Sequence, residues 1–383
     1  MLAVGSAATG QTAGPVPRVV EIDWPAMPPT STSAGDERLN DLGAIRLPVI
    51  LPEPFLAFSS LKLVGEPLQY QASVMADWGS MQIFGTRVAL DVSEAEGAPS
   101  SDAAEVRFDE QSAELAFNRY GAAYVVRVDC HSATDRRCID PQFVTQLVRT
   151  ASVAGGVQDG SQKPVAPPPF TATGPTATSG AISGFTWLAP GRLDASHGTG
   201  NRSSFVYAPG ITFPVEKAPA YLGSMVYGYG GDHSAFRNVS WRDARNYRYP
   251  WQDNFCEPRK YRTPMCPSGT GHQGVDIRPM DARKAVHWAV ATEDGVIGSA
   301  RGWSVSLLGK SGTRYDYRHL QMNRLPVHAG SRVKAGDHIG LISDNFSVPT
   351  PVHLHLEMRQ NLRGKGMVPV PPYMSLVRAY EAM

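Results

Sequence analysis

Hydrophobic and polar residues alternate with a period of two in several short segments of the chain. The clearest segment covers residues 352–359, and a second covers residues 313–320. Because successive side chains of a β-strand point to opposite faces, each segment predicts a strand with one apolar and one polar face. Residues 81–92 and 122–130 are rich in β-branched and aromatic residues, which also predicts strands.

Helical spacing follows Asp140 and Pro141. Asp is a favoured helix N-cap, and Pro fits the first helical position. Apolar residues then recur at positions 143, 144, 147 and 148, and Gly155-Gly156 predicts the end of the helix. Residues 45–154 therefore predict a small α+β domain.

The remaining segments differ in composition. Residues 1–44 are rich in Pro, Ser, Thr, Gly and Ala and predict a mostly disordered leader. The small apolar residues at 2–9 fit either the end of a signal peptide or a disordered arm. Residues 155–184, with Pro-Pro-Pro at 167–169, predict a linker. Residues 185–383 are turn-rich with short strands, and predict a second, mostly β domain.

Composition and charge narrow the class of protein. The chain has 37 glycines and 31 prolines among 383 residues, which favours turn-rich β domains over a helical bundle. The formal net charge of +1 provides no basic face for nucleic acid. No run approaches the ~18 consecutive apolar residues of a membrane-spanning helix, so we expect no integral membrane segment.

Four cysteines form two sequence-local pairs, Cys130 with Cys138 and Cys256 with Cys266. None lies in a C-x₂₋₄-C pattern, so a thiolate zinc site is not indicated. Of the three possible connectivities we favour the two local disulfides. Because disulfides persist in oxidising compartments, they indicate an exported protein; four buried free thiols are the alternative.

Two histidine patterns could carry chemistry. His272-x₃-Asp276 is flanked by glycines that disfavour a helix, so its two side chains must converge through a turn or a bent strand. His353-x-His355 lies on a predicted strand, which places both rings on one face about 6–7 Å apart. Three N and O ligands with one position left for water describe a catalytic zinc site. His272, Asp276 and one of the two H-x-H histidines supply that set.

The order of these motifs resembles a known family. H-x₃-D, the strand Tyr-Arg-His319-Leu, Val-Lys-Ala-Gly-Asp-His-Ile-Gly at 333–340 and H-L-H-L-E together resemble the lysostaphin-type, or LytM-like, zinc endopeptidases. The resemblance covers about residues 205–360. It implies an antiparallel β domain with a substrate groove, zinc held by His272, Asp276 and His355, and two non-ligand catalytic histidines, His319 and His353.

The resemblance also implies a function. These enzymes cleave peptide bonds in peptidoglycan, so we expect peptidoglycan peptide stems as substrate and a periplasmic or secreted location. A non-enzymatic relative that activates other wall hydrolases is the main alternative, and an unrelated metalloenzyme or metal carrier is another. Residues 45–154 lie outside the resemblance; this domain could bind glycan, dock a protein partner or inhibit the enzyme by covering the groove.

Overall fold

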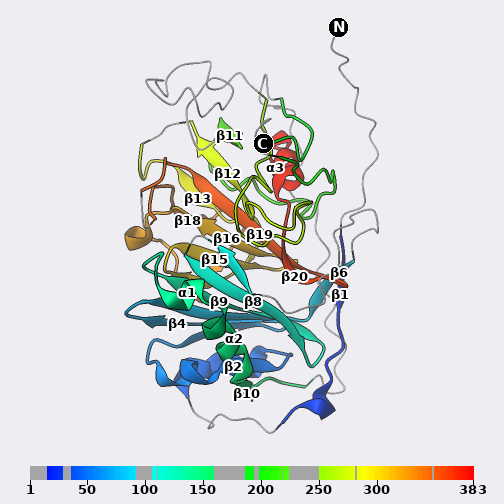
Figure 1. The fold of residues 1–383 in the computed structure, drawn as a ribbon, viewed down its shortest axis with the longest axis vertical. Coiled ribbons are helices and arrows are strands. Elements are labelled where there is room, and N and C mark those ends of the chain that lie inside the picture. The colour runs from blue at the N-terminus through cyan, green and yellow to red at the C-terminus, as the bar shows by residue number, and fades with distance from the viewer. Residues whose placement is uncertain are drawn as a thin grey trace.

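The computed structural model describes residues 15–28, 36–91, 106–109, 111–158, 186–193, 198–217, 219–223, 250–280, 283–346 and 349–383. The described chain is mostly β, which confirms the predicted fold class. An N-terminal sheet lies below a larger C-terminal sheet in Figure 1. The first 14 residues and most of the predicted linker, from residue 159, lie outside the described residues.

The N-terminal part is built on an antiparallel sheet with the strand order β3-β4-β5-β9-β8-β7. These strands are β3 (Lys62–Glu66), β4 (Gln69–Ala76), β5 (Gly79–Thr86), β7 (Arg107–Asp109), β8 (Ser112–Arg119) and β9 (Ala122–Cys130). A separate strand pair joins β2 (Val49–Pro52) to β10 (Ala151–Gly155). One apolar core joins the sheet, β2 and the two helices that follow β9.

Two helices follow β9: α1 (Arg136–Ile139) and α2 (Pro141–Arg149). The predicted cap of α2 is confirmed, because the Asp140 side chain accepts a hydrogen bond from Gln142 N. The predicted end of the helix is wrong. Helix α2 ends at Arg149, because the next residues extend into β10 and pair with β2 before Gly155-Gly156 is reached.

The C-terminal part contains a ten-stranded sheet in which β19 pairs with β12 and β20 along one edge and β16 along the other. Its strands are β1 (Val16–Val19), β6 (Val88–Asp91), β11 (Ala220–Leu222), β12 (Gly274–Pro279), β14 (Gly295–Arg301), β15 (Ser304–Gly309), β16 (Arg314–Arg318), β17 (Arg332–Val333), β19 (Leu354–Leu362) and β20 (Gly366–Val370). A separate pair joins β13 (Trp288–Val290) to β18 (His338–Leu341). The chain ends in α3 (Tyr373–Glu381).

Two segments differ from the predicted organisation. β1 lies inside the predicted leader. Within the described residues, short 3₁₀ helices add ordered turns: η1 (Trp24–Ala26), η2 (Glu37–Ala44), η3 (Glu53–Ala57) and η7 (Met322–Arg324). The predicted strand at 81–92 is two strands, β5 and β6, separated by Arg87. The Arg87 carbonyl accepts from Val20 N, and its side chain donates to the Val20 and Arg46 carbonyls. β6 then pairs with β1 and meets β19 of the larger sheet.

The two faces of β19 have different environments. Leu354, Leu356 and Met358 are fully buried in the same apolar core as residues of α3. The alternate residues, including His355 and Glu357, face the other side. That second face carries the candidate site at one end and meets the N-terminal sheet at the other.

The junction between the two sheets is buried. Val64, Phe84 and Val125 of the N-terminal sheet pack with Val296, Leu308 and Met367 of the C-terminal part. Hydrogen bonds also cross it: Ser306 Oγ donates to Gln71 Oε1 at 3.0 Å, and Gln69 Nε2 donates to the Gly309 carbonyl at 2.9 Å. The two parts therefore share one packed interface of apolar and polar side chains.

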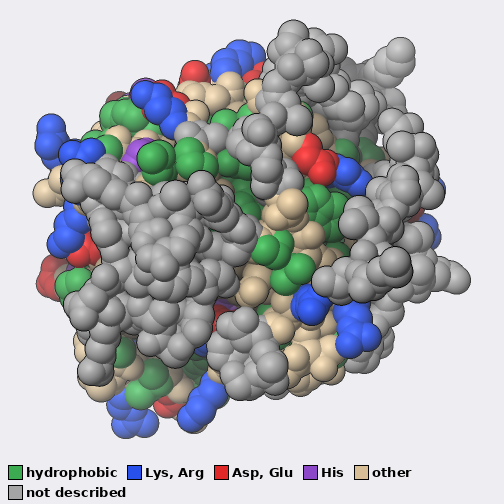
Figure 2. Space-filling model, turned by 90° about the horizontal axis from the view of Figure 1, so that it is seen from above, with side chains coloured by type: hydrophobic (Ala, Val, Ile, Leu, Met, Phe, Trp, Pro, Cys, Tyr) green, Lys and Arg blue, Asp and Glu red, His purple; other side chains and the backbone are tan. Residues whose placement is uncertain are grey.

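Both predicted disulfides, Cys130–Cys138 and Cys256–Cys266, are confirmed. Within the described residues no helix is long and apolar enough to cross a membrane. Among the described residues on the face shown in Figure 2, Lys and Arg side chains lie at several separate places.

Candidate metal centre

Three side chains of the predicted metal-binding set meet in one buried cluster. Asp276 on β12 lies opposite His355 on β19 in the antiparallel pair, and His272 lies in the loop just before β12. Two backbone hydrogen bonds hold that loop: Cys256 N donates to the His272 carbonyl at 3.0 Å, and His272 N donates to the Glu257 carbonyl at 2.9 Å. The bend that the H-x₃-D motif requires is thus made before β12 begins.

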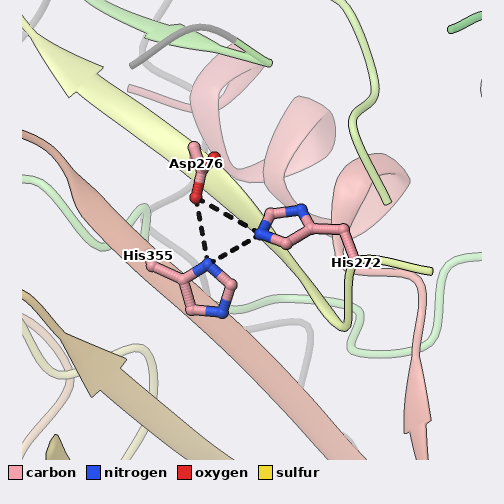
Figure 3. A group of neighbouring side chains, drawn as sticks. All are labelled: His272, Asp276 and His355. Carbon is pink, nitrogen blue, oxygen red and sulfur yellow. Dashed lines mark hydrogen bonds and ion pairs between the residues drawn. The ribbon is translucent and has the colours of Figure 1, made fainter. Parts of the chain in front are cut away.

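The donor atoms of this set point toward one another (Figure 3). His355 Nδ1 lies 3.0 Å from both His272 Nε2 and Asp276 Oδ1, and His272 Nε2 lies 3.6 Å from Asp276 Oδ1. All three donor atoms lie within 4.8 Å of one another. Two imidazole nitrogens and one carboxylate oxygen suit zinc with an open coordination position, so this set fits the ion.

The remaining polar atoms of the set have partners of their own. His272 Nδ1 lies 3.0 Å from the Asn254 carbonyl, and the Asn254 side chain donates to Asp276 Oδ2 at 2.9 Å. His355 Nε2 lies 3.3 Å from Glu357 Oε1. With each ring donating from its outer nitrogen, His272 Nε2 and His355 Nδ1 keep a lone pair for a metal.

The two further histidines lie beside this cluster. His353 Nδ1 is 2.7 Å from the Pro351 carbonyl, and its Nε2 is 3.5 Å from Asp276 Oδ1. His319 Nδ1 is 3.3 Å from the Asn345 carbonyl, and its ring centre lies 4.5 Å from that of His353. In both rings a carbonyl accepts from Nδ1, so Nε2 is the nitrogen that can carry the basic lone pair.

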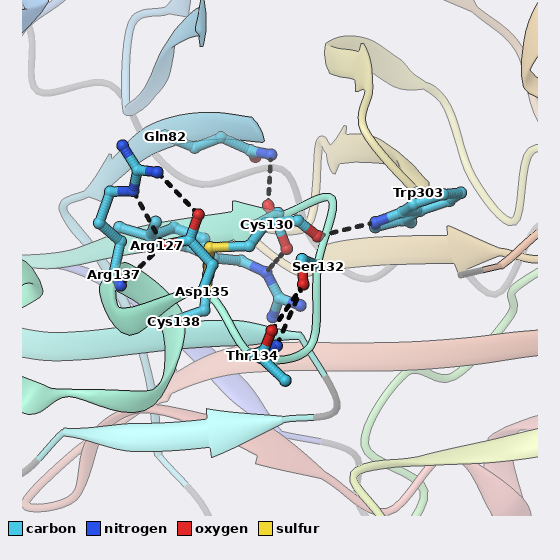
Figure 4. Close-up of a disulfide and its surroundings, with 11 residues drawn as sticks. Gln82, Arg127, Cys130, Ser132, Thr134, Asp135, Arg137, Cys138 and Trp303 are labelled. Carbon is cyan, nitrogen blue, oxygen red and sulfur yellow. Dashed lines mark hydrogen bonds and ion pairs between the residues drawn. A yellow bond between two sulfur atoms is a disulfide. The ribbon is translucent and has the colours of Figure 1, made fainter. Parts of the chain in front are cut away.

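Aromatic side chains connect this site to the N-terminal part. Phe346 packs edge-on to His319 with ring centres 5.4 Å apart, and Trp303 packs on Phe346 at 5.7 Å. Trp303 Nε1 donates to the Cys130 carbonyl at 3.2 Å, beside the first disulfide (Figure 4). The loop that Cys130–Cys138 closes is therefore hydrogen-bonded to Trp303, which packs on the Phe346 ring next to His319.

The sequence model of peptidase family M23 matches residues 270–368. Residues 270–368 are a peptidase family M23 domain. The matched range contains His272, Asp276, His319, His353 and His355, and it begins later than the resemblance seen in the sequence. No curated protein matches the chain.

Solved structures similar to this chain include LytM and lysostaphin peptidases. A structure named for the glycyl-glycine endopeptidase lytM of Ruminococcus gnavus is 22% identical, covering 45% of this chain and 61% of that one, with a TM-score of 0.28. Csd3 of Helicobacter pylori is 20% identical over 43% of this chain and 33% of that one, with a TM-score of 0.23. The lysostaphin catalytic domain of Staphylococcus simulans is 25% identical, covering 28% of this chain and 80% of that one, with a TM-score of 0.22. The chain thus spans about three fifths of the first protein and one third of the second.

Burial and neighbouring charges shift the pKa values of the M23 site. Burial alone would lower the pKa of His355, but its hydrogen bonds to Asp276 and Glu357 outweigh that effect and raise the pKa to about 9. Burial, together with His353 and His355, holds the pKa of His319 well below its usual value. His355 therefore holds a proton that a metal binding at Nδ1 would have to displace, whereas His319 is neutral.

The sequence interpretation missed two residues of the site. Asn254 contacts both His272 and Asp276, but it lies 22 residues from Asp276 in no recognisable motif. Glu357 had a usable signal, because it continues the period-two pattern of His353 and His355 on the same strand face. The roles assigned to the five motif residues remain predictions.

Proposed function

We propose that this chain is an exported zinc endopeptidase that hydrolyses peptide crosslinks of bacterial peptidoglycan. The main support is the His-Asp-His donor set beside two further histidines, each with its Nδ1 bonded to a backbone carbonyl. The matched peptidase family supports hydrolysis of a peptide bond. Two disulfides fit an oxidising compartment such as a periplasm or the cell exterior.

In this proposal His272, Asp276 and His355 hold zinc. When bound there, zinc supplies a Lewis acid that lowers the pKa of a water molecule toward ~7 and polarises a carbonyl. The chain's own contribution is to fix the donor atoms before the metal arrives. Asn254 and Glu357 do this by bonding the outer atoms of the three ligands, so neither imidazole has to turn on binding.

The non-ligand histidines move protons. His353 Nε2 faces the metal-binding carboxylate and is placed to accept a proton from the attacking water. His319, kept neutral by burial, presents a second basic nitrogen from the neighbouring ring. A proton accepted by either ring on Nε2 can then pass to the amine that leaves when the peptide bond breaks.

The test is mass analysis of muropeptides after incubation of the zinc-loaded chain with crosslinked peptidoglycan. We expect crosslinked fragments to decrease and their separate halves to appear, with the mass of one water added. The masses also name the bond: a D-alanyl to diamino-acid crosslink is the expected target, and a glycine bridge would give different products.

The variants His353→Ala and His319→Ala provide the control. Each should keep its zinc and lose about 100-fold or more in rate, because general acid–base catalysis contributes on that scale. Loss of zinc from either variant would contradict the division into ligands and proton carriers. Full zinc occupancy with no new products from the native chain would favour the non-enzymatic regulator instead.

A further inference from the structure

The polar face of β19 continues beyond the metal site into a buried charge network. Glu357 and Arg359 follow His355 at two-residue intervals, and each of the two is 1% exposed. The network reaches Glu114 on β8, which is 2% exposed and lies in the N-terminal sheet, outside the M23 domain. A residue of the first domain is thus two side chains away from a metal ligand.

Each link in the network is a hydrogen bond or ion pair. Glu357 offers Oε1 to His355 Nε2 at 3.3 Å and accepts from Arg359 on Oε2, at 2.6 Å from Nη2 and 3.1 Å from Nε. The remaining arm of Arg359 donates from Nη1 to Glu114 Oε1 at 2.6 Å. Because a guanidinium is a planar fork, a carboxylate on one arm fixes the direction in which the others point.

The charges around Glu114 keep it available for this contact. Arg107 Nε lies 3.0 Å from Glu114 Oε1, and Arg127 Nη1 lies 3.4 Å from Oε2. Burial would raise the pKa of Glu114, but Arg359, Arg107 and Arg127 outweigh it and lower the pKa to about 2. Removing this carboxylate would leave three buried guanidinium groups competing for fewer acidic partners. Arg359 would keep its bonds to Glu357 and Gln273 but lose the one at Nη1, so its position would be less firmly fixed.

We propose that Glu114 is a positioning residue for the metal centre. It anchors Arg359, which orients Glu357, which in turn holds His355 with Nδ1 directed at the metal. The inference rests on the proposed function in that it takes His355 as a ligand. It gives the first domain a role: the N-terminal sheet completes the support of the M23 site instead of acting only as a cover or a targeting module.

The test uses the full chain carrying Glu114→Gln, which keeps the size of the side chain and removes its charge. Two readouts are independent of turnover: zinc affinity by competition with a chromophoric chelator, and the visible absorption bands of the Co²⁺-substituted protein, which report ligand geometry. We expect Glu357→Gln to weaken zinc binding roughly 10–100-fold, as for other supporting residues of metal sites, and Glu114→Gln to weaken it roughly 3–10-fold. The Co²⁺ bands should shift in both variants.

The matched control is Ser306→Ala, which removes a hydrogen bond across the same interface without touching the network. It should leave zinc affinity and the Co²⁺ bands unchanged. The double variant Glu114→Gln/Glu357→Gln should bind zinc as weakly as Glu357→Gln alone. Glu114 acts on the metal site only through Glu357, so its loss adds nothing once Glu357 is changed. If Glu114→Gln does not fold, the charge-balanced variant Glu114→Gln/Arg107→Gln replaces it and is judged in the same way.

The outcomes separate this inference from the proposed function. Native zinc affinity and native Co²⁺ bands in a folded Glu114 variant would overturn the positioning role and leave the peptidase proposal untouched. An additive loss in the double variant would also overturn it, because Glu114 would then act by another route. Failure of the native chain to bind zinc at all would instead contradict the proposed function itself.

Discussion

Asp253 is a buried carboxylate that should make stability depend on pH. Its side chain is 1% exposed and accepts hydrogen bonds from Phe255 N and Gly191 N, both at 3.0 Å. Burial raises its pKa to about 7, against the opposing effect of those two bonds. The folded protein therefore binds a proton that the unfolded chain releases near pH 4, so the contribution of Asp253 to stability is complete below pH 4 and is lost as the pH rises to 7.

Asp253→Asn should flatten this dependence. We expect the unfolding free energy to fall less steeply between pH 4 and 7 than in the native chain, by up to about 1.4 kcal/mol per pH unit. Urea unfolding at several pH values, with a chelator present throughout, measures the slope. Asp135→Asn is the control: Arg137 lowers the pKa of that carboxyl, so its removal should not change the slope between pH 5 and 7. Equal slopes for the native chain and Asp253→Asn would contradict the assignment.

At the scale of single residues, the sequence predicts the residues of the motifs but misses the residues that hold them in position. His272 with Asp276, and His353 with His355, are recognisable as two motifs because the members of each lie close in sequence. The pairing of β12 with β19 then brings the two motifs together. Glu114 could not be found in this way, since its partner Arg359 is 245 residues away. Contacts of that range depend on how two sheets pack, and no local pattern records it.

At the scale of elements, the loop closed by Cys256–Cys266 supports His272, the first of the three proposed zinc ligands. Its residues hold His272 from both sides of the backbone, through Cys256 N and the Glu257 carbonyl. Opening the loop with Cys256→Ser/Cys266→Ser should lower the unfolding free energy by roughly 3 kcal/mol in the chain-entropy model. It should also weaken zinc binding, because His272 loses its fixed backbone. Chelator competition and urea unfolding measure the two effects.

The other disulfide provides a matched control for that prediction. Cys130–Cys138 closes a loop of similar length, so Cys130→Ser/Cys138→Ser should cost similar stability. It lies in the N-terminal part and contacts none of the three ligands, so zinc affinity should stay native. A similar loss of zinc affinity in both double variants would mean that general destabilisation, and not the His272 loop, is responsible.

Elements were predictable where the pattern was local. The predicted strand at 122–130 coincides with β9, and that at 352–359 overlaps β19. The break between β5 and β6 was missed because it depends on partners far along the chain: β6 leaves the N-terminal sheet to pair with β1 and to meet β19 at Leu362. Strand pairing at long range carries no period that a single sequence reveals.

At the scale of the molecule, the N-terminal and C-terminal parts are joined in two ways: by strand pairing at a sheet edge and by packing between the faces of the two sheets. β6 touches the C-terminal sheet, and the facing surfaces bury Phe84, Leu308 and Met367 in one cluster. The same interface buries the Arg359–Glu114 ion pair. Separating the parts would expose apolar surface to water and leave Arg359 without Glu114, and breaking a buried pair costs about 3–5 kcal/mol. This arrangement favours a supporting role for the first domain over inhibition.

Deleting the first domain should therefore lower both the stability and the hydrolytic activity of the remaining chain. A chain of residues 185–383 should unfold at a lower temperature than the full chain with zinc in excess, and should hydrolyse peptidoglycan more slowly. A full chain cut once between residues 159 and 184 is the matched control. It breaks the same connection but keeps both parts, so the packed interface should hold them together and preserve most of the activity. Faster hydrolysis by residues 185–383 than by the full chain would contradict the supporting role. Removing a domain speeds hydrolysis by the remaining chain only if that domain blocks the groove.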